Sequence, residues 1–203
     1  MSLSLIQLLP YQAIADPTDG FTSLSLGSSN FVIQKPYDVS VSDRYSFQNG
    51  IRKLWVYSTD KPFMSGSTTK PRTEVRIRGY DYTSGVWQFE GYAYVPSGTT
   101  GVSIMQIFGG TTAATTMVLR VYNGALSYYK TPIVQNTYNR WFRVNVIHDV
   151  GAPKVKVYID GSLVYQVNGN GASTHYFKFG VYTQDNPSNY MESQWRGIKV
   201  LKK

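Results

Sequence analysis

The chain has 203 residues, a net charge of +8 and no cysteine, and 15% of its residues are aromatic. The absence of cysteine excludes a disulfide framework and a thiolate zinc site, so the fold must be held together by its hydrophobic core. The positive charge comes from a shortage of acidic residues, 12 against 20 Lys and Arg, and it favours an acidic partner such as a polysaccharide, a nucleic acid or a membrane surface.

Residues 1–15 contain an apolar run and end in Ala13-Ile14-Ala15, a small-x-small sequence directly before Asp16. This pattern is typical of the end of a secretory signal peptide, and an ordinary N-terminal strand is the alternative. We therefore expect a signal-peptide remnant at 1–15 and a single domain at 16–203. The protein is then secreted to the extracellular space or cell wall, with the vacuole as a second destination. No later segment approaches about eighteen uninterrupted apolar residues, so we expect no membrane partner.

The rest of the chain consists of short runs of alternating apolar and polar residues between turn residues, without a helical pattern longer than about two turns. Asn-Gly at 123–124 and Asp-Gly at 160–161 each lie between two such runs, which predicts two tight hairpins. About eleven strands at this spacing predict an all-β fold of two antiparallel sheets, a sandwich or jelly roll. Three basic residues near the C-terminus are typical of an exposed edge strand protected by charge: Lys199, Lys202 and Lys203.

Three of the predicted strands carry polar or aromatic side chains along one face, because side chains two positions apart point the same way. These faces hold Arg72, Glu74, Arg76 and Arg78, then Gln106 and Phe108, and then Tyr176, Lys178, Gly180, Tyr182 and Gln184. A sheet with a core on its other side could offer such hydrogen bonds and rings to a sugar chain, and Gly180 would let the ligand approach the backbone. The alternative for the arginine row is an ion-pair ladder on a solvated face.

The same strands carry a resemblance to a known family. The segments PRTEVR, MQIF and YFKFGVYTQ resemble the signature strands of alginate lyases, polysaccharide lyase family seven, whose patterns are R-(S/T)-E-(L/V)-R, Q-(I/V)-H and Y-F-K-x-G-x-Y-x-Q. Their order and approximate spacing agree, and the resemblance extends from about residue 20 to 203. Outside these segments, FVIQKPYDV and NRWFRVNVIHDV are more similar to plant citrate-binding proteins, a branch of the same superfamily. The resemblance implies a concanavalin-like β-jelly roll with a concave groove for an anionic polysaccharide.

The resemblance also implies roles for individual residues in β-elimination of a uronan. Arg72 and Gln106 would neutralise the substrate carboxylate, and Tyr182 would transfer the proton. The residues implied to bind substrate are Glu74, Arg76, Arg78, Phe108, Tyr176, Lys178 and Gln184. Phe108 stands where the family pattern has histidine, and a phenyl ring cannot move a proton. We therefore expect either a lyase that uses Tyr182 as both base and acid, or a non-catalytic protein that binds an acidic glycan or a small polycarboxylate such as citrate.

Other partners and cofactors are not expected. The basic residues form no blocks, no helix is available for a major groove, and the aromatic signatures of RNA-binding sheets are missing, which argues against nucleic acid. The two histidines, His148 and His175, are far apart in sequence, and both are interpreted as structural residues. We expect no metal, no other cofactor and a monomeric protein.

Overall fold

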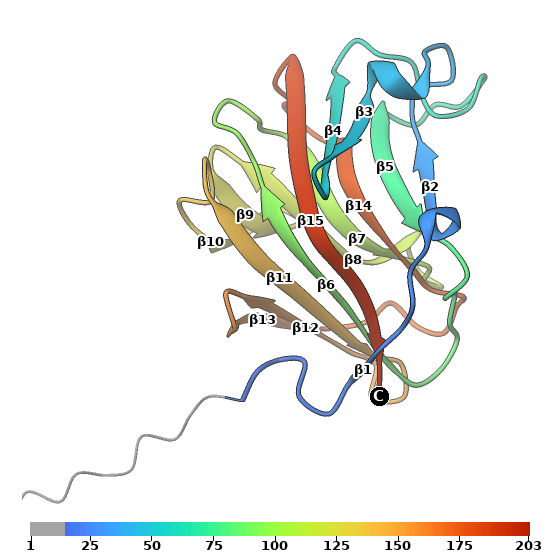
Figure 1. Ribbon diagram of the computed structural model, residues 1–203, viewed down its shortest axis with the longest axis vertical. Coiled ribbons are helices and arrows are strands. Elements are labelled where there is room, and N and C mark those ends of the chain that lie inside the picture. The colour runs from blue at the N-terminus through green and yellow to red at the C-terminus, as the bar shows by residue number, and fades with distance from the viewer. Residues whose placement is uncertain (1–14) are drawn as a thin grey trace, which may run out of the picture.

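The computed structural model of the protein describes residues 15–203, so the predicted signal-peptide remnant lies outside the described residues except for Ala15. Two antiparallel β-sheets make up the fold, with only two short 3₁₀ helices, η1 (Ser28–Asn30) and η2 (Val41–Asp43). Figure 1 shows the sheets as two packed layers. The all-β prediction is therefore confirmed. Within residues 15–203, no helix is long and apolar enough to cross a membrane.

The larger layer, called the large sheet below, has eight strands in the order β13-β12-β11-β6-β15-β4-β3, with β1 paired to β15. Its strands are β1 (Thr22–Ser23), β3 (Tyr45–Gln48), β4 (Ile51–Tyr57), β6 (Val86–Tyr94), β11 (Trp141–Asp149), β12 (Lys154–Ile159), β13 (Ser162–Asn168) and β15 (Tyr190–Lys202). The other layer, the small sheet, has seven strands in the order β10-β9-β8-β7-β14-β5-β2. Its strands are β2 (Phe31–Gln34), β5 (Arg72–Ile77), β7 (Val102–Phe108), β8 (Thr115–Tyr122), β9 (Ala125–Tyr128), β10 (Thr131–Val134) and β14 (Tyr176–Thr183).

The core lies between the two sheets and is formed by the inward half of each alternating strand. Leu54, Phe89, Phe179 and Trp195 are all fully buried there. The Phe89 ring lies 5.9 Å from Phe179 and 5.7 Å from Trp195, measured between centroids, so aromatic packing joins the two sheets. Because this layer is apolar on both sheets, the polar half of each strand is directed to the outer faces.

Both predicted hairpins are confirmed. The pair at 123–124 joins β8 to β9, and the pair at 160–161 joins β12 to β13. Asn123, Gly124, Asp160 and Gly161 have φ of 49°, 82°, 51° and 85°, the left-handed conformation that a two-residue type I′ turn requires at both positions.

The predicted edge strand at the C-terminus is wrong. Strand β15 is central in the large sheet, paired with β6 on one side and β4 on the other. Lys199 does not protect an edge, because its Nζ donates a 2.8 Å hydrogen bond to the buried carboxylate of Glu90 on β6. A lysine that crosses to a neighbouring strand and a lysine that protects an edge look the same in the sequence.

The two histidines lie together in the interior. His148 and His175 are 2% and 0% exposed, and their ring centroids are 4.6 Å apart. The hydroxyl of Tyr82 lies 3.0 Å from Nδ1 of His148, and Nδ1 of His175 lies 3.0 Å from the carbonyl oxygen of Gly109. Burial lowers the pKa of His148 to about 4 and also lowers the pKa of His175. Both rings are therefore neutral parts of the core at neutral pH.

Candidate functional site

Three adjacent strands of the small sheet place the predicted polar faces side by side. Strand β14 pairs with β5 on one side and with β7 on the other. Lys178 is the partner of both Arg76 and Gln106, Tyr182 is opposite Arg72, and Tyr176 is opposite Phe108. The intervening residues Thr73, Val75 and Ile77 are buried. Alternation along each strand therefore directs the polar set to the outer face of the small sheet.

A buried carboxylate lies at the centre of this set. Glu74 is 1% exposed, and its oxygens accept hydrogen bonds from Nε2 of Gln106 at 2.5 Å and from Nζ of Lys178 at 2.8 Å. Nη1 of Arg72 lies 3.5 Å from the same carboxylate. Glu74 thus fixes the positions of an amide, an ammonium and a guanidinium at once. A buried charge is tolerated only with such partners.

Lys178 is as deeply buried as its partner, with 2% of its surface exposed. Burial lowers the pKa of Lys178, the carboxylate of Glu74 opposes that shift, and the positive charge of Arg72 adds to it. The ammonium is bonded to Glu74 and also lies 5.9 Å from the ring centroid of Phe108. Its charge is therefore held close to the surface of the site without being free in solvent.

The guanidinium groups of two arginines lie over tyrosine rings. The guanidinium carbon of Arg72 is 3.8 Å from the ring centroid of Tyr182, and that of Arg76 is 3.9 Å from the ring centroid of Tyr176. Phe108 stacks on Tyr176 with centroids 4.9 Å apart. The Nε atoms of Arg72 and Arg76 are buried and have no hydrogen-bond partner among the described residues. These cation–π contacts hold each guanidinium over its ring and leave the buried Nε donors unused.

A cavity of about 360 Å³ opens over these side chains. Its lining comprises Gln34, Phe63, Met64, Thr69, Arg72, Gln106, Phe108, Ala114, Thr115, Tyr176, Lys178 and Tyr182. The volume lies in the range of about 300–1,000 Å³ that is common for small-ligand sites. Arg72, Gln106 and Tyr182, which come from three different strands, therefore share one cavity, and it is large enough for one acidic sugar unit.

Several lining residues were not predicted from the sequence. Gln34 lies at the end of β2, and its buried Oε1 has no hydrogen-bond partner among residues 15–203. Phe63, Met64 and Thr69 come from the loop between β4 and β5. That loop contains a Gly/Ser/Thr-rich run next to the arginine strand, which was the only sequence signal for it. Gln34 follows an ordinary apolar run and carried no signal.

Four of the predicted site residues do not line the cavity. Glu74 lies beneath its wall, and Arg76 is next to it, bound to Asp81 at 2.5 Å. Arg78 is exposed beyond the end of β5, and Gln184 lies beyond the end of β14, where its amide donates to the carbonyls of Tyr182 and Thr183. The polar faces predicted from the sequence therefore extend beyond the cavity.

The role expected of Gly180 is wrong. A Cβ at this position would lie 2.4 Å from the carbonyl oxygen of Thr73 and 3.0 Å from Cδ2 of Leu54, so the missing side chain makes room for β5 and the core. Its φ of +138° coincides with a shift in the β14–β7 register between Phe179 and Tyr182. Gly180 therefore allows a bulge that sets the position of Tyr182. It does not leave space for a ligand to approach the backbone, as had been predicted.

Comparison with known proteins gives concordant results. A model of the family described as alginate lyase matches residues 24–202. The citrate-binding protein of Hevea brasiliensis is 58% identical over 190 residues, which is 93% of this chain and 80% of that protein. Among solved structures, an alginate lyase from Corynebacterium sp. has a TM-score of 0.66 at 21% identity, with 88% of this chain and 91% of that chain covered. An alginate lyase from Pseudomonas aeruginosa has a TM-score of 0.64 at 18% identity, with 86% and 99% covered. The two structures share the β-jelly-roll fold with this chain.

Proposed function

The chain belongs to the alginate lyase family, and from this premise we propose that the cavity on the small sheet binds a uronic-acid unit of an anionic polysaccharide. The observation that carries the proposal is the convergence of Arg72, Gln106 and Tyr182 on one cavity. The guanidinium of Arg72 supports it, because this side chain lines the cavity and its Nη1 lies 3.5 Å from Glu74, so a sugar carboxylate could accept a charge-assisted hydrogen bond from its terminal nitrogens. Phe108 and Tyr176 offer a stacked pair of rings to the apolar face of the sugar.

We propose β-elimination as the chemistry that these groups would support. With the carboxylate neutralised by Arg72 and Gln106, a phenolate at Tyr182 would take the proton from C5 of the uronate. A double bond then forms between C4 and C5 as the C4–oxygen bond breaks, and Tyr182 returns the proton to the departing oxygen. Phe108 replaces the histidine of the family pattern, so Tyr182 would have to serve both steps alone.

A second candidate function is binding of a small polycarboxylate without turnover. Two observations favour it: the replacement of the family histidine by Phe108, and the 58% identity to a protein named for binding citrate. The same cations suit citrate, because guanidinium groups bind carboxylates with paired donors.

One experiment separates these functions. The protein is incubated with glucuronan, polygalacturonate and alginate, and the ultraviolet absorbance of the unsaturated product is followed, while citrate binding is measured by calorimetry. Growth of absorbance that is lost in Tyr182→Phe supports elimination. Polymer binding with a flat trace supports a binding protein for acidic glycans. Citrate binding without polymer binding supports the second function, and binding of neither kind of ligand contradicts both.

Two further proposals concern where the protein acts and its oligomeric state. We propose that the protein acts as a secreted monomer, in the cell wall or extracellular space where acidic polysaccharides occur, after removal of residues 1–15. Mass spectrometry of the secreted protein should find Asp16 as its first residue, and light scattering should give the mass of one chain. A retained N-terminal segment or a stable dimer would contradict this part of the proposal.

A further inference from the structure

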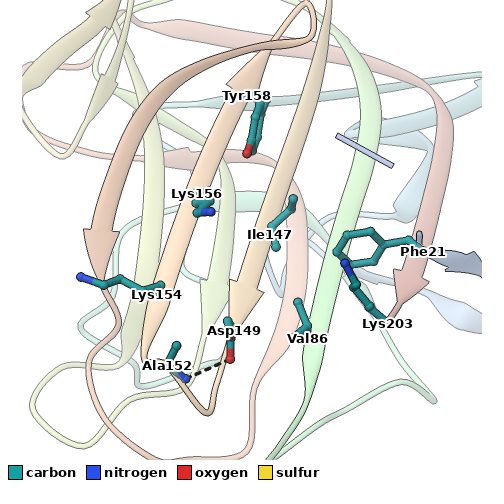
Figure 2. A pocket seen from close by; sticks show the side chains of 9 residues that line it. All are labelled: Phe21, Val86, Ile147, Asp149, Ala152, Lys154, Lys156, Tyr158 and Lys203. Atoms are coloured by element: carbon teal, nitrogen blue, oxygen red, sulfur yellow. Dashed lines mark hydrogen bonds between the residues drawn. The ribbon is translucent and has the colours of Figure 1, made fainter. Parts of the chain in front are cut away.

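The outer face of the large sheet contains a second hollow, on the opposite side of the sandwich from the candidate site. Its volume is about 430 Å³, and we refer to it as the lysine hollow. Its lining comprises Phe21, Val86, Ile147, Asp149, Ala152, Lys154, Lys156, Tyr158 and Lys203. Figure 2 shows Lys154 on one side of the hollow and Lys203 next to Phe21 on the other, with Ile147 and Lys156 between them.

Strand alternation accounts for this arrangement. On β12, Lys154, Lys156 and Tyr158 are half-buried, whereas the residues between them are buried in the core. The register places Lys154 opposite Asp149, which is in turn opposite Val86 on β6. Lysines two residues apart on one strand are separated by about 7 Å, so their ammonium groups act on the same small area.

The three lysines of the hollow share its lining with one carboxylate, that of Asp149, and are not paired with it in the described part of the chain. Nζ of Lys154 donates a 2.6 Å hydrogen bond to the neutral amide oxygen of Asn168, and Nζ of Lys203 lies 5.8 Å from the ring centroid of Phe21. Oδ1 of Asp149 accepts from the backbone of Ala152. In the described part of the chain, the salt bridges involve none of the three lysines.

Two other cations on the same face are paired with acids. Arg143 binds Asp16 and Glu90, and Lys199 binds Glu90. The face therefore pairs these two cations in one area, whereas the adjoining hollow carries three lysines and one carboxylate. Such an excess of positive charge in a recess attracts an anion.

We propose that the lysine hollow is a second binding site for an anionic polysaccharide, distinct from the cavity on the small sheet. Lysine ammonium groups are compact charges that can bind carboxylate or sulfate in many orientations, which suits a polymer bound along a sheet. Phe21 and Tyr158, with Val86 and Ile147 below them, offer apolar surface to the sugar rings. These apolar groups are half-buried in a recess, which suits contact with a sugar ring better than insertion into a bilayer.

A second site on the opposite face would make the monomer bivalent. Sites on opposite faces of a monomer cannot bind the same short stretch of polymer, so one protein would join two polysaccharide chains. Such bivalent binding raises the apparent affinity for a dense polymer network far above that of either site. The second site does not depend on turnover at the first.

The test uses two triple variants with the same change in charge. Lys154→Gln/Lys156→Gln/Lys203→Gln removes the cations of the hollow, and Lys35→Gln/Lys61→Gln/Lys130→Gln removes three lysines that line neither cavity. Both are made in the native chain and in Arg72→Gln, and circular dichroism checks the fold.

Binding to polygalacturonate and to heparin is measured by affinity electrophoresis, and cross-linking of polygalacturonate is measured by turbidity. Single-stranded RNA is the competing anion.

In the Arg72→Gln background, we expect polymer binding to persist and to fall about tenfold in the hollow variant, with little change in the control variant. Turbidity should be lost in the hollow variant of the native chain. Equal losses in the two triple variants, no loss in either, or tighter binding of RNA than of both glycans through the same lysines would overturn the proposal. Failure of the function proposed above gives a different result, namely polymer binding that Arg72→Gln leaves unchanged.

Discussion

The two outer faces of the sandwich contain clusters built from the same kinds of residue. On the small sheet, the buried carboxylate of Glu74 binds a lysine and an amide and lies near Arg72. On the large sheet, the carboxylate of Glu90, 2% exposed, binds Arg143, Lys199 and the amide of Asn145. Burial would raise the pKa of Glu90, but the hydrogen bonds from its three partners outweigh burial and lower it. Each cluster thus stabilises a charge inside a sheet face.

The two clusters differ in whether their arginine binds a second carboxylate. Arg143 also holds both carboxylate oxygens of Asp16, at 2.6 and 2.8 Å, and hydrogen bonds from Arg143 hold the pKa of Asp16 well below its usual value. The next residue, Pro17, is buried and accepts a hydrogen bond from Gln88. Within residues 15–203, Arg72 is paired with no second carboxylate, and its side chain lines the small-sheet cavity. We propose that a ligand carboxylate takes at Arg72 the place that Asp16 takes at Arg143.

The largest effect is expected from removing the central carboxylates. Glu74→Gln leaves the ammonium of Lys178 buried without a counter-charge, and we expect a loss of about 3–5 kcal/mol in the free energy of unfolding. Glu90→Gln should cost about 1–2 kcal/mol, because Lys199 is half exposed and Arg143 keeps Asp16. Urea denaturation measures both. Adding Lys178→Met to Glu74→Gln should recover part of the loss. Equal losses of stability at the two glutamates would contradict the expectation that burial of the lysine partner, Lys178 or Lys199, determines the cost.

Acid should affect the core before it affects the carboxylate clusters. The folded pKa of His148, about 4, is below its usual value of 6.5, so the unfolded chain binds a proton that the folded chain does not. Stability is therefore complete above about pH 6.5 and falls by about 3 kcal/mol as the pH drops to about 4. The lowered pKa values of Asp16 and Glu90 act in the same direction at lower pH, because their contribution to stability is lost only as the pH falls below their usual pKa values.

Urea titrations from pH 7 to 3 should thus show two phases of destabilisation. His148→Phe should make the first phase shallower and leave the second in place. A stability that stays constant between pH 7 and 4 would contradict the buried, neutral state of the histidine pair.

The two arginines should separate binding from stability. Arg72→Gln is expected to weaken uronan binding about 10- to 100-fold, because a charge-assisted contact to the ligand is lost, with less than about 1 kcal/mol lost in stability. Arg143→Gln should leave binding at the small-sheet cavity unchanged and destabilise the fold by about 1–2 kcal/mol. Calorimetric titration with a uronate oligosaccharide and urea denaturation measure the two effects. If Arg143→Gln weakened binding at that cavity, the division of roles would be wrong.

The smallest effect is expected at the covering acid. Asp16→Asn keeps the shape of the side chain and removes its charge, and its pair with Arg143 is partly exposed. We expect a loss of about 0.5–1 kcal/mol in stability, measured by thermal unfolding at low and high salt. The difference from the native chain should shrink at high salt, because screening weakens the pair. Asp38→Asn, which removes an exposed charge that is not bonded to Asp16 or Arg143, is the matched control.

The local features of the fold follow from the sequence, whereas strand order does not. Alternation correctly directs Arg72 and Tyr182 away from the core, and Asn123-Gly124 specifies its hairpin through backbone conformation alone. No local pattern reveals that β15 is central, because a basic strand can lie at an edge or can pair its lysine with a buried acid on the next strand.

The candidate site shows the same division. The grouping of β5, β7 and β14 was expected from the family resemblance, since their pairing joins segments far apart in the chain. Alternation alone also treats Gly180 as a member of the ligand face, but a bulge turns it toward Thr73 and Leu54. Gln34 and Met64 enter the cavity through tertiary packing of an edge strand and a loop, which period-two patterns do not describe.

The most direct test of the central claim is a crystal structure of the protein with a bound uronate oligosaccharide. The account predicts a sugar carboxylate within hydrogen-bonding distance of Arg72 and Gln106, with C5 of that sugar directed at the hydroxyl of Tyr182. An oligosaccharide bound elsewhere while this cavity holds only solvent would contradict the claim.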